Sequence, residues 1–202
     1  MSKTLAKWRS IAKYNKGELY FTTIVLSAIP LTQDTNWESV TQRINADWDT
    51  FKTDWRNLVS HRFPKTIWRA VLEYDLVKVG DIGTHHQALF KDMGIDLSGA
   101  SWVLVPHTHM LVKPTIPLKN FKGWLNAKWQ GSYRCHTEPL YQKQTCLEAV
   151  INLHGYCHKK RTQYKDGGIG DMKAVFLNDY DEPWKSRITM LHQEDIDFCS
   201  KE

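Results

Sequence analysis

The 202-residue sequence predicts a single α+β domain, in which helices pack on one side of an antiparallel sheet. Its segments follow one another as strand, helix, strand, strand, helix, strand and helix, and strands without an intervening helix favour antiparallel pairing. No G-x-G-x-x-G or G-x-x-x-x-G-K-[ST] motif occurs, which argues against a nucleotide-binding parallel sheet. No repeat or flexible linker divides residues 1–202, so we expect one domain.

The first half of the chain predicts a strand, a helix and a second strand. Residues 20–29 are rich in aromatic and β-branched side chains and precede Pro30, as at the end of a strand. Apolar residues then recur every three or four positions from Trp37 to Leu58, after a Thr35-x-x-Glu38 capping box, which predicts a long helix. Residues 66–78 alternate as in a strand, with Trp68, Ala70, Leu72, Tyr74 and Leu76 on one face and Arg69, Glu73 and Asp75 on the other.

The second half predicts a buried strand, a helix, an edge strand and a last helix. Residues 102–112 are apolar except around Pro106 and two histidines, which is typical of a buried strand. Residues 118–129 have a helical pattern, and residues 133–141 fit an edge strand. A Thr145-x-x-Glu148 capping box begins a helix that we expect to run to about Tyr164.

The charge of the chain favours an acidic partner such as nucleic acid. The net charge is +5 and the pI is about 8.9. The segment 179–202 carries seven acidic and three basic residues, so the positive excess belongs to residues 1–178, which include the motif-bearing core, residues 20–165.

Cysteine usage and hydropathy favour a cytoplasmic protein without membrane association. The longest apolar run, residues 24–30, is shorter than the roughly 18 residues of a membrane span, and the basic N-terminus is not followed by a signal-peptide pattern. The four cysteines form no C-x-x-C pair, so we expect reduced thiols. A zinc site among Cys135, Cys146 and Cys157 is the alternative.

A pair of histidines inside the third predicted strand, residues 102–112, predicts a metal site. His107 and His109 are two residues apart, so their imidazoles share one face and could bind one ion. Antiparallel pairing with the preceding strand would bring Glu73 beside them as a third ligand. Asp75, His85 and His86 remain alternative ligands.

The last predicted helix carries a tyrosine and a lysine one turn apart. At positions i and i+4, the Lys160 ammonium could stabilise a Tyr156 phenolate or contact a phosphate. Tyr164 lies on the apolar stripe of this helix and is expected in the core, whereas Tyr156 lies on its more polar side.

These motifs together resemble the HUH endonucleases, and in particular the rolling-circle replication initiators of small plasmids and phages. The resemblance rests on Phe21-Thr-Thr23, Leu72-Glu-Tyr74, Pro106-His-Thr-His-Met-Leu111 and Gly155-Tyr-Cys-His-Lys-Lys160, in this order. The sequence differs from the family in having Thr108 where a bulky apolar residue is usual, and Lys160 where two-tyrosine initiators have their second tyrosine. The helicase domain of larger relatives is absent from these residues.

The resemblance implies a metal-dependent nickase of single-stranded DNA or an origin hairpin. Tyr156 would form a 5′-phosphotyrosine bond and free a 3′-hydroxyl for a host polymerase, and a separate host helicase would unwind the DNA. His107, His109 and Glu73 would hold Mn²⁺ or Mg²⁺. A single-strand transposase, a relaxase and a non-catalytic single-stranded DNA-binding module are the alternatives.

Such a substrate requires basic residues for its phosphates and aromatic rings for its bases. The sequence offers both after the third predicted strand, residues 102–112, and around Tyr156. The predicted DNA contacts are Lys119, Lys122, Trp124, Lys128, Trp129, Tyr133 and Arg134, with Lys159, Lys160, Arg161 and Lys165 near the nucleophile.

Overall fold

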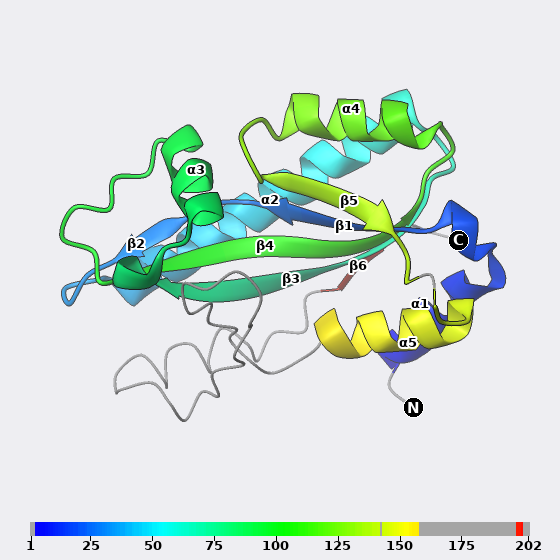
Figure 1. Ribbon diagram of the computed structural model, residues 1–202, viewed down its shortest axis with the longest axis horizontal. Coiled ribbons are helices and arrows are strands. Elements are labelled where there is room, and N and C mark those ends of the chain that lie inside the picture. Colours follow the sequence, from blue (N-terminus) through cyan, green and yellow to red (C-terminus); the bar gives the residue numbers. More distant parts are fainter. Residues whose placement is uncertain (1–2, 142, 158–196, 200–202) are drawn as a thin grey trace.

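Strand β4 (Trp102–Lys113) lies at the centre of an antiparallel sheet, and all of its residues except the first and the last are buried. The computed structural model describes residues 3–141, 143–157 and 197–199, in which the strand order is β5-β1-β4-β3-β6 and β2 also pairs with β4 (Figure 1). The α+β class is thereby confirmed. The remaining strands are β1 (Tyr20–Val25), β2 (Ile29–Leu31), β3 (Ile67–Lys78), β5 (Cys135–Pro139) and β6 (Asp197–Cys199).

The predicted helices are present, and the structure has two further helices, one before β1 and one between β3 and β4. The helices are α1 (Lys3–Ser10), α2 (Trp37–Arg62), α3 (Thr84–Asp92), α4 (Leu118–Lys128) and α5 (Cys146–Cys157), with short 3₁₀ turns at Ile11–Lys13, Lys16–Glu18 and Val79–Asp81. The sequence pattern did not predict α1 and α3 because each is short and places few apolar residues in the core. Within the described ranges, no helix has both the length and the apolar character that crossing a membrane requires.

Helices cover both faces of the sheet, so the prediction of helices on one side is wrong. The first face packs against α2, which passes behind the sheet in Figure 1, and against α4. The second face is covered by α1 and α5 at one end and by α3 at the other. The physical reason is that β4 is apolar on both faces: Leu104 and Met110 enter the first core, while Val105 and Leu111 must be buried on the second.

Pro106 divides the first predicted strand into two. Residues 20–29 were expected to be continuous, but β1 ends at Val25 and β2 begins at Ile29. Pro106 has no N–H with which to continue a ladder to this part of the chain. Its carbonyl oxygen instead accepts hydrogen bonds from the backbone N–H groups of Leu26 and Ser27, where the chain crosses over from β1 to β2.

One of the two predicted capping boxes is present. The Glu148 carboxylate accepts a hydrogen bond from the backbone N–H of Thr145 and the Thr145 hydroxyl accepts one from the backbone N–H of Glu148, so this box begins α5. The box at Thr35 is wrong, because the Asn36 side chain caps α2 and the Thr35 hydroxyl accepts a hydrogen bond from a preceding backbone N–H. The predicted continuation of the last helix to Tyr164 lies outside the described residues.

Cys135, Cys146 and Cys157 are free thiols in separate surroundings. Cys135 packs against the core formed with α2, whereas Cys146 and Cys157 belong to the core formed with α1 and α5. Burial raises the pKa of the Cys135 thiol to about 12. The alternative of a zinc site among these three cysteines is therefore wrong, since their side chains do not gather in one place.

The aromatic core under α2 predicts a large loss of stability on truncation. Trp55 is fully buried and contacts the rings of Phe51, Phe63, Trp68, Phe121 and Trp129. Trp55→Ala should lower the free energy of unfolding by about 3–5 kcal/mol, because a large cavity would remain. Thr53→Ala, on the exposed face of the same helix, should change it by less than about 0.5 kcal/mol. Urea denaturation of both variants measures the difference, and equal effects would contradict this assignment of the core.

Candidate metal centre

The register between β3 and β4 brings three potential metal ligands together on the second face of the sheet. Glu73 lies directly opposite His107, which is the antiparallel pairing expected from the sequence. His109 projects from the same face of β4, two residues further along. Both imidazoles are buried, and the Glu73 side chain is mostly buried.

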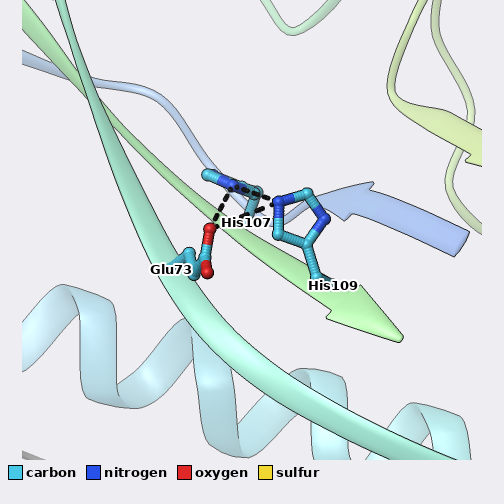
Figure 2. A group of neighbouring side chains, drawn as sticks. All are labelled: Glu73, His107 and His109. Atoms are coloured by element: carbon cyan, nitrogen blue, oxygen red, sulfur yellow. Dashed lines mark hydrogen bonds and ion pairs between the residues drawn. The ribbon is translucent and has the colours of Figure 1, made fainter. Parts of the chain in front are cut away.

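The three side chains converge on a volume suited to one ion (Figure 2). Nε2 of His107 lies 3.2 Å from Nε2 of His109, and Oε2 of Glu73 lies 3.7 Å and 3.3 Å from these two atoms, respectively. Metal–ligand bonds of about 2.1 Å would separate neighbouring ligand atoms by about 3.0 Å at octahedral angles and about 3.4 Å at tetrahedral angles. Glu73, His107 and His109 therefore form a group that could hold a metal ion.

Hydrogen bonds to Nδ1 of each imidazole leave the two Nε2 atoms directed at this volume. Nδ1 of His107 lies 3.0 Å from the Val105 carbonyl oxygen, which can only accept, so Nδ1 carries the hydrogen. Nδ1 of His109 lies 2.8 Å from the Thr23 hydroxyl oxygen on β1, which can accept in the same way. Such partners fix the tautomer and the ring orientation of metal-binding histidines.

The second carboxylate oxygen of Glu73 also fits a ligand role. Oε1 is buried and has no hydrogen-bond partner among the described residues. A buried carboxylate oxygen without a partner is costly, and a cation bound in the bidentate mode would compensate it. The donor set of two imidazole nitrogens and one carboxylate is typical of sites for divalent metals.

The alternative ligands lie elsewhere. Asp75 is the nearest, with Oδ2 at 3.9 Å from Nδ1 of His107, but it does not belong to the converging group. His85 and His86 lie on α3, where the ring of His85 stacks on Tyr133 and the ring of His86 packs near Phe90. The expectation that either histidine could be a metal ligand is wrong, since both side chains are held on α3 away from the group.

The carboxylates set the protonation of the two imidazoles. Burial by itself would raise the pKa of Glu73, but hydrogen bonds and charge interactions with His107 and His109 lower it to about 2. Burial disfavours a charged His107, yet Asp75 and Glu73 raise its pKa to about 9. Burial and the neighbouring His107 charge lower the pKa of His109. The metal-free group thus holds an ionised Glu73, a protonated His107 and a neutral His109 at neutral pH.

Tyr156 lies beside this group. Its ring centroid is 5.4 Å from that of His109 and 6.4 Å from that of Phe21, and the Phe21 ring in turn stacks on His109 at 5.0 Å. The Tyr156 side chain is half-buried at the margin of the core formed with α1 and α5. It is thus less accessible than its place on the polar side of the helix suggested. Burial raises the pKa of the Tyr156 phenol, and the nearby charges of Asp75 and Glu73 raise it further.

The basic residues predicted to contact DNA on α4 lie on the opposite face of the sheet. Helix α4 packs with α2 on the first core, whereas the metal group faces α1, α3 and α5. Lys128 pairs with Asp54 of α2 at 2.9 Å, and the Arg62 guanidinium covers the Trp124 ring at 4.3 Å. The fold therefore does not bring Lys119, Lys122, Trp124 or Lys128 to the metal group.

Two other predicted DNA contacts serve the fold. Trp129 is buried against Phe51 and Trp55, so its indole cannot stack on a base, and the prediction for Trp129 is wrong. It completes the apolar stripe of α4 instead. The Arg134 guanidinium donates hydrogen bonds to the carbonyl oxygens of Val25 and Leu26 at the end of β1.

The remaining predicted residues lie outside the described part of the chain. These are Lys159, Lys160, Arg161, Tyr164 and Lys165. Thr23 and Phe21 are the site residues to which the sequence pattern assigned no role. Their positions opposite His109 and Leu111 follow from the pairing of β1 with β4, which joins segments far apart in the sequence. The Phe21-Thr-Thr23 motif is the one sequence signal that points to them.

Comparisons with known protein families, with curated proteins and with solved structures found no match to this chain. Its candidate site therefore rests on its own geometry.

Removal of the histidines should abolish metal binding. His107→Ala combined with His109→Ala deletes two of three ligands, so Mn²⁺ affinity should fall by about 100-fold or more. His136→Ala, which removes an exposed histidine paired with Glu138 on β5, is the matched control and should leave binding unchanged. Electron paramagnetic resonance of free Mn²⁺ measures both. Unchanged affinity in the double variant would contradict the assignment.

Metal binding should also depend on pH, because a cation must displace the His107 proton. Its pKa of about 9 means that His107 is protonated below this value, so lowering the pH weakens binding. Apparent Mn²⁺ affinity should rise about tenfold per pH unit between about pH 7 and about pH 8.5. Asp75→Asn removes a charge that raises this pKa, so the rise should level off at lower pH. An affinity independent of pH would contradict the charge state assigned to His107.

Proposed function

We propose that this chain is a metal-dependent endonuclease that cuts and rejoins single-stranded DNA at a specific sequence and thereby initiates rolling-circle replication. The proposal rests on the position of Tyr156 beside the metal group: its ring centroid lies 5.4 Å from that of His109. A nucleophile and a cation must both reach one phosphate in such a reaction. The order of motifs that resembles the HUH endonucleases supports the same function.

The reaction would be a transesterification at one phosphodiester. The Tyr156 hydroxyl oxygen attacks the phosphorus atom and loses its proton, while the bond from phosphorus to the 3′-oxygen breaks. The departing 3′-oxygen takes up a proton, so the products are a 5′-phosphotyrosine and a free 3′-hydroxyl. Attack by that hydroxyl on the phosphotyrosine reverses the step and rejoins the strand.

The charges around Tyr156 explain why such a site would require a cation. Phenol is a weak nucleophile near its ordinary pKa of about 10, and Asp75 and Glu73 raise the pKa of Tyr156 still further. A divalent cation held by His107, His109 and Glu73, Mn²⁺ or Mg²⁺, would supply positive charge near both the phenol and the phosphate. Phe21 packs on both His109 and Tyr156 and so orients the two rings relative to each other.

The proposed partners are a single-stranded DNA or origin hairpin, a host polymerase that extends the 3′-hydroxyl, and a host helicase in the cytoplasm. A single-strand transposase or a relaxase would use the same chemistry on a different DNA.

Tyr156→Phe should eliminate covalent attachment to DNA. The variant removes one oxygen from a half-buried side chain, so the free energy of unfolding should change by about 1 kcal/mol or less, while no phosphotyrosine can form. The test incubates the protein and Mn²⁺ with a labelled random pool of single-stranded DNA and looks for adducts that survive denaturing electrophoresis, followed by peptide mapping.

Tyr164→Phe is the matched control, because Tyr164 is the other tyrosine predicted on the same helix. This variant should still form the adduct. An adduct that persists in Tyr156→Phe, or maps to Tyr164, would overturn the choice of nucleophile. Metal-independent binding without any adduct in the unmodified protein would instead identify a non-catalytic single-stranded DNA-binding module.

A further inference from the structure

The stacked rings of Tyr133 and His85 lie on the face of the sheet that carries the metal group. The ring of Tyr133, in the loop between α4 and β5, stacks on the imidazole of His85 of α3, with centroids 4.3 Å apart and an interplanar angle of 25°. Tyr133 is 58% exposed, and His85 is exposed as well. Helix α3 packs on Val105 and Val25 and thus covers the face from which the metal group projects.

The backbone of Tyr133 is held in a conformation that favours glycine. Its φ of 59° is uncommon for a residue with a large side chain and costs free energy unless the surroundings enforce it. The surroundings do so, since the backbone N–H of Ser132 donates a hydrogen bond to the Asp92 carboxylate at 2.7 Å. The Arg134 guanidinium holds the end of β1 from the other side. The loop therefore fixes an exposed ring in place, where a flexible loop would let it move.

This loop is tied to the strand next to the metal group. The backbone N–H of Val25 donates a hydrogen bond to the Arg134 carbonyl oxygen at 2.8 Å, and Val25 lies directly opposite His107 in the register between β1 and β4. Tyr133 therefore directly precedes Arg134, whose carbonyl oxygen is hydrogen-bonded to Val25, the residue opposite the metal ligand His107. Tyr156 lies against His109 from α5, and the stack of Tyr133 on His85 belongs to α3, which covers another part of the same face.

We propose that Tyr133 and His85 form a stacking site for one unpaired nucleobase of the DNA strand whose phosphate lies at the metal group. This inference rests on the proposed function and adds a binding site for the substrate. Every nucleobase has a π-face, so an exposed, fixed ring binds single-stranded DNA through stacking with little sequence preference. His85 supports the inner face of Tyr133 and leaves the outer face for the base.

The test measures binding of fluorescent single-stranded DNA to protein in the Tyr156→Phe background without added metal, where no cleavage interferes. Tyr133→Ala should weaken binding roughly tenfold, as expected for loss of one base stack, whereas Tyr133→Phe should retain it. Trp124→Ala is the matched control, because Trp124 is a partly exposed aromatic on the opposite face of the sheet, and it should have no effect. A DNA strand without bases has nothing to stack on Tyr133, so it should bind with equal affinity to Tyr133→Ala and to the Tyr156→Phe protein from which that variant is made.

The stacking site would be overturned if Tyr133→Ala bound single-stranded DNA as tightly as its parent, or if it lost as much affinity for the abasic strand as for the normal one. A larger loss of affinity in Trp124→Ala, or no binding of single-stranded DNA by the parent protein, would also overturn it. Photocrosslinking of iodouracil-containing DNA should give a peptide that contains Tyr133, and a crosslink confined to α4 would contradict it. Unchanged binding in Tyr133→Ala together with a retained Tyr156 adduct would overturn the stacking site alone, whereas loss of the adduct with stacking retained would overturn only the nicking activity.

Discussion

Strand β4 is hydrogen-bonded along both edges and buried on both faces, and the site follows from this constraint. A polar side chain in such a strand needs a partner within the protein. Thr108, which points into the α2 core, donates its hydroxyl to the Val71 carbonyl oxygen. His107 and His109 satisfy Nδ1 with the Val105 carbonyl and the Thr23 hydroxyl. What remains is a pair of Nε2 atoms that face Glu73, in a position that the strands on either side hold fixed.

The proton on His107 and a metal ion would compete for the same place. The Nε2 atoms of His107 and His109 lie 3.2 Å apart and both face Oε2 of Glu73, so a proton on Nε2 of His107 occupies the volume that a metal ion would take. The mostly buried charge of Glu73 and the partly exposed charge of Asp75 favour a cation there, whether proton or metal. The same carboxylates raise the pKa of Tyr156, which links the protonation of the tyrosine to the occupancy of the group.

The helices that cover the second face of the sheet, α1, α3 and α5, form the surroundings of the metal group. Apolar residues at its two ends pack under α3 and under α1 and α5, and the polar group lies between these two clusters. Each cover carries an aromatic side chain on this face: Tyr156 of α5 packs against His109, and Tyr133 stacks on His85 of α3. The first face instead packs against one continuous core that is rich in aromatic side chains.

The sequence by itself determined the strands β3 and β4, the helix α2, the shared face of His107 and His109, and the proximity of Glu73. The strands, the helix and the shared face follow from short-range periodicity, because alternation assigns the faces of a strand and spacings of three and four assign the stripe of a helix. The proximity of Glu73 follows from antiparallel pairing of two strands that are consecutive in the predicted order. Only the tertiary structure decided that α4 packs with α2 on the first face of the sheet, which removes Trp129 from the surface and separates Lys119 and Lys122 from the metal group. It also decided that Thr23 orients His109, since pairing between segments distant in the chain depends on how all the elements pack together and leaves no periodic signal in either segment.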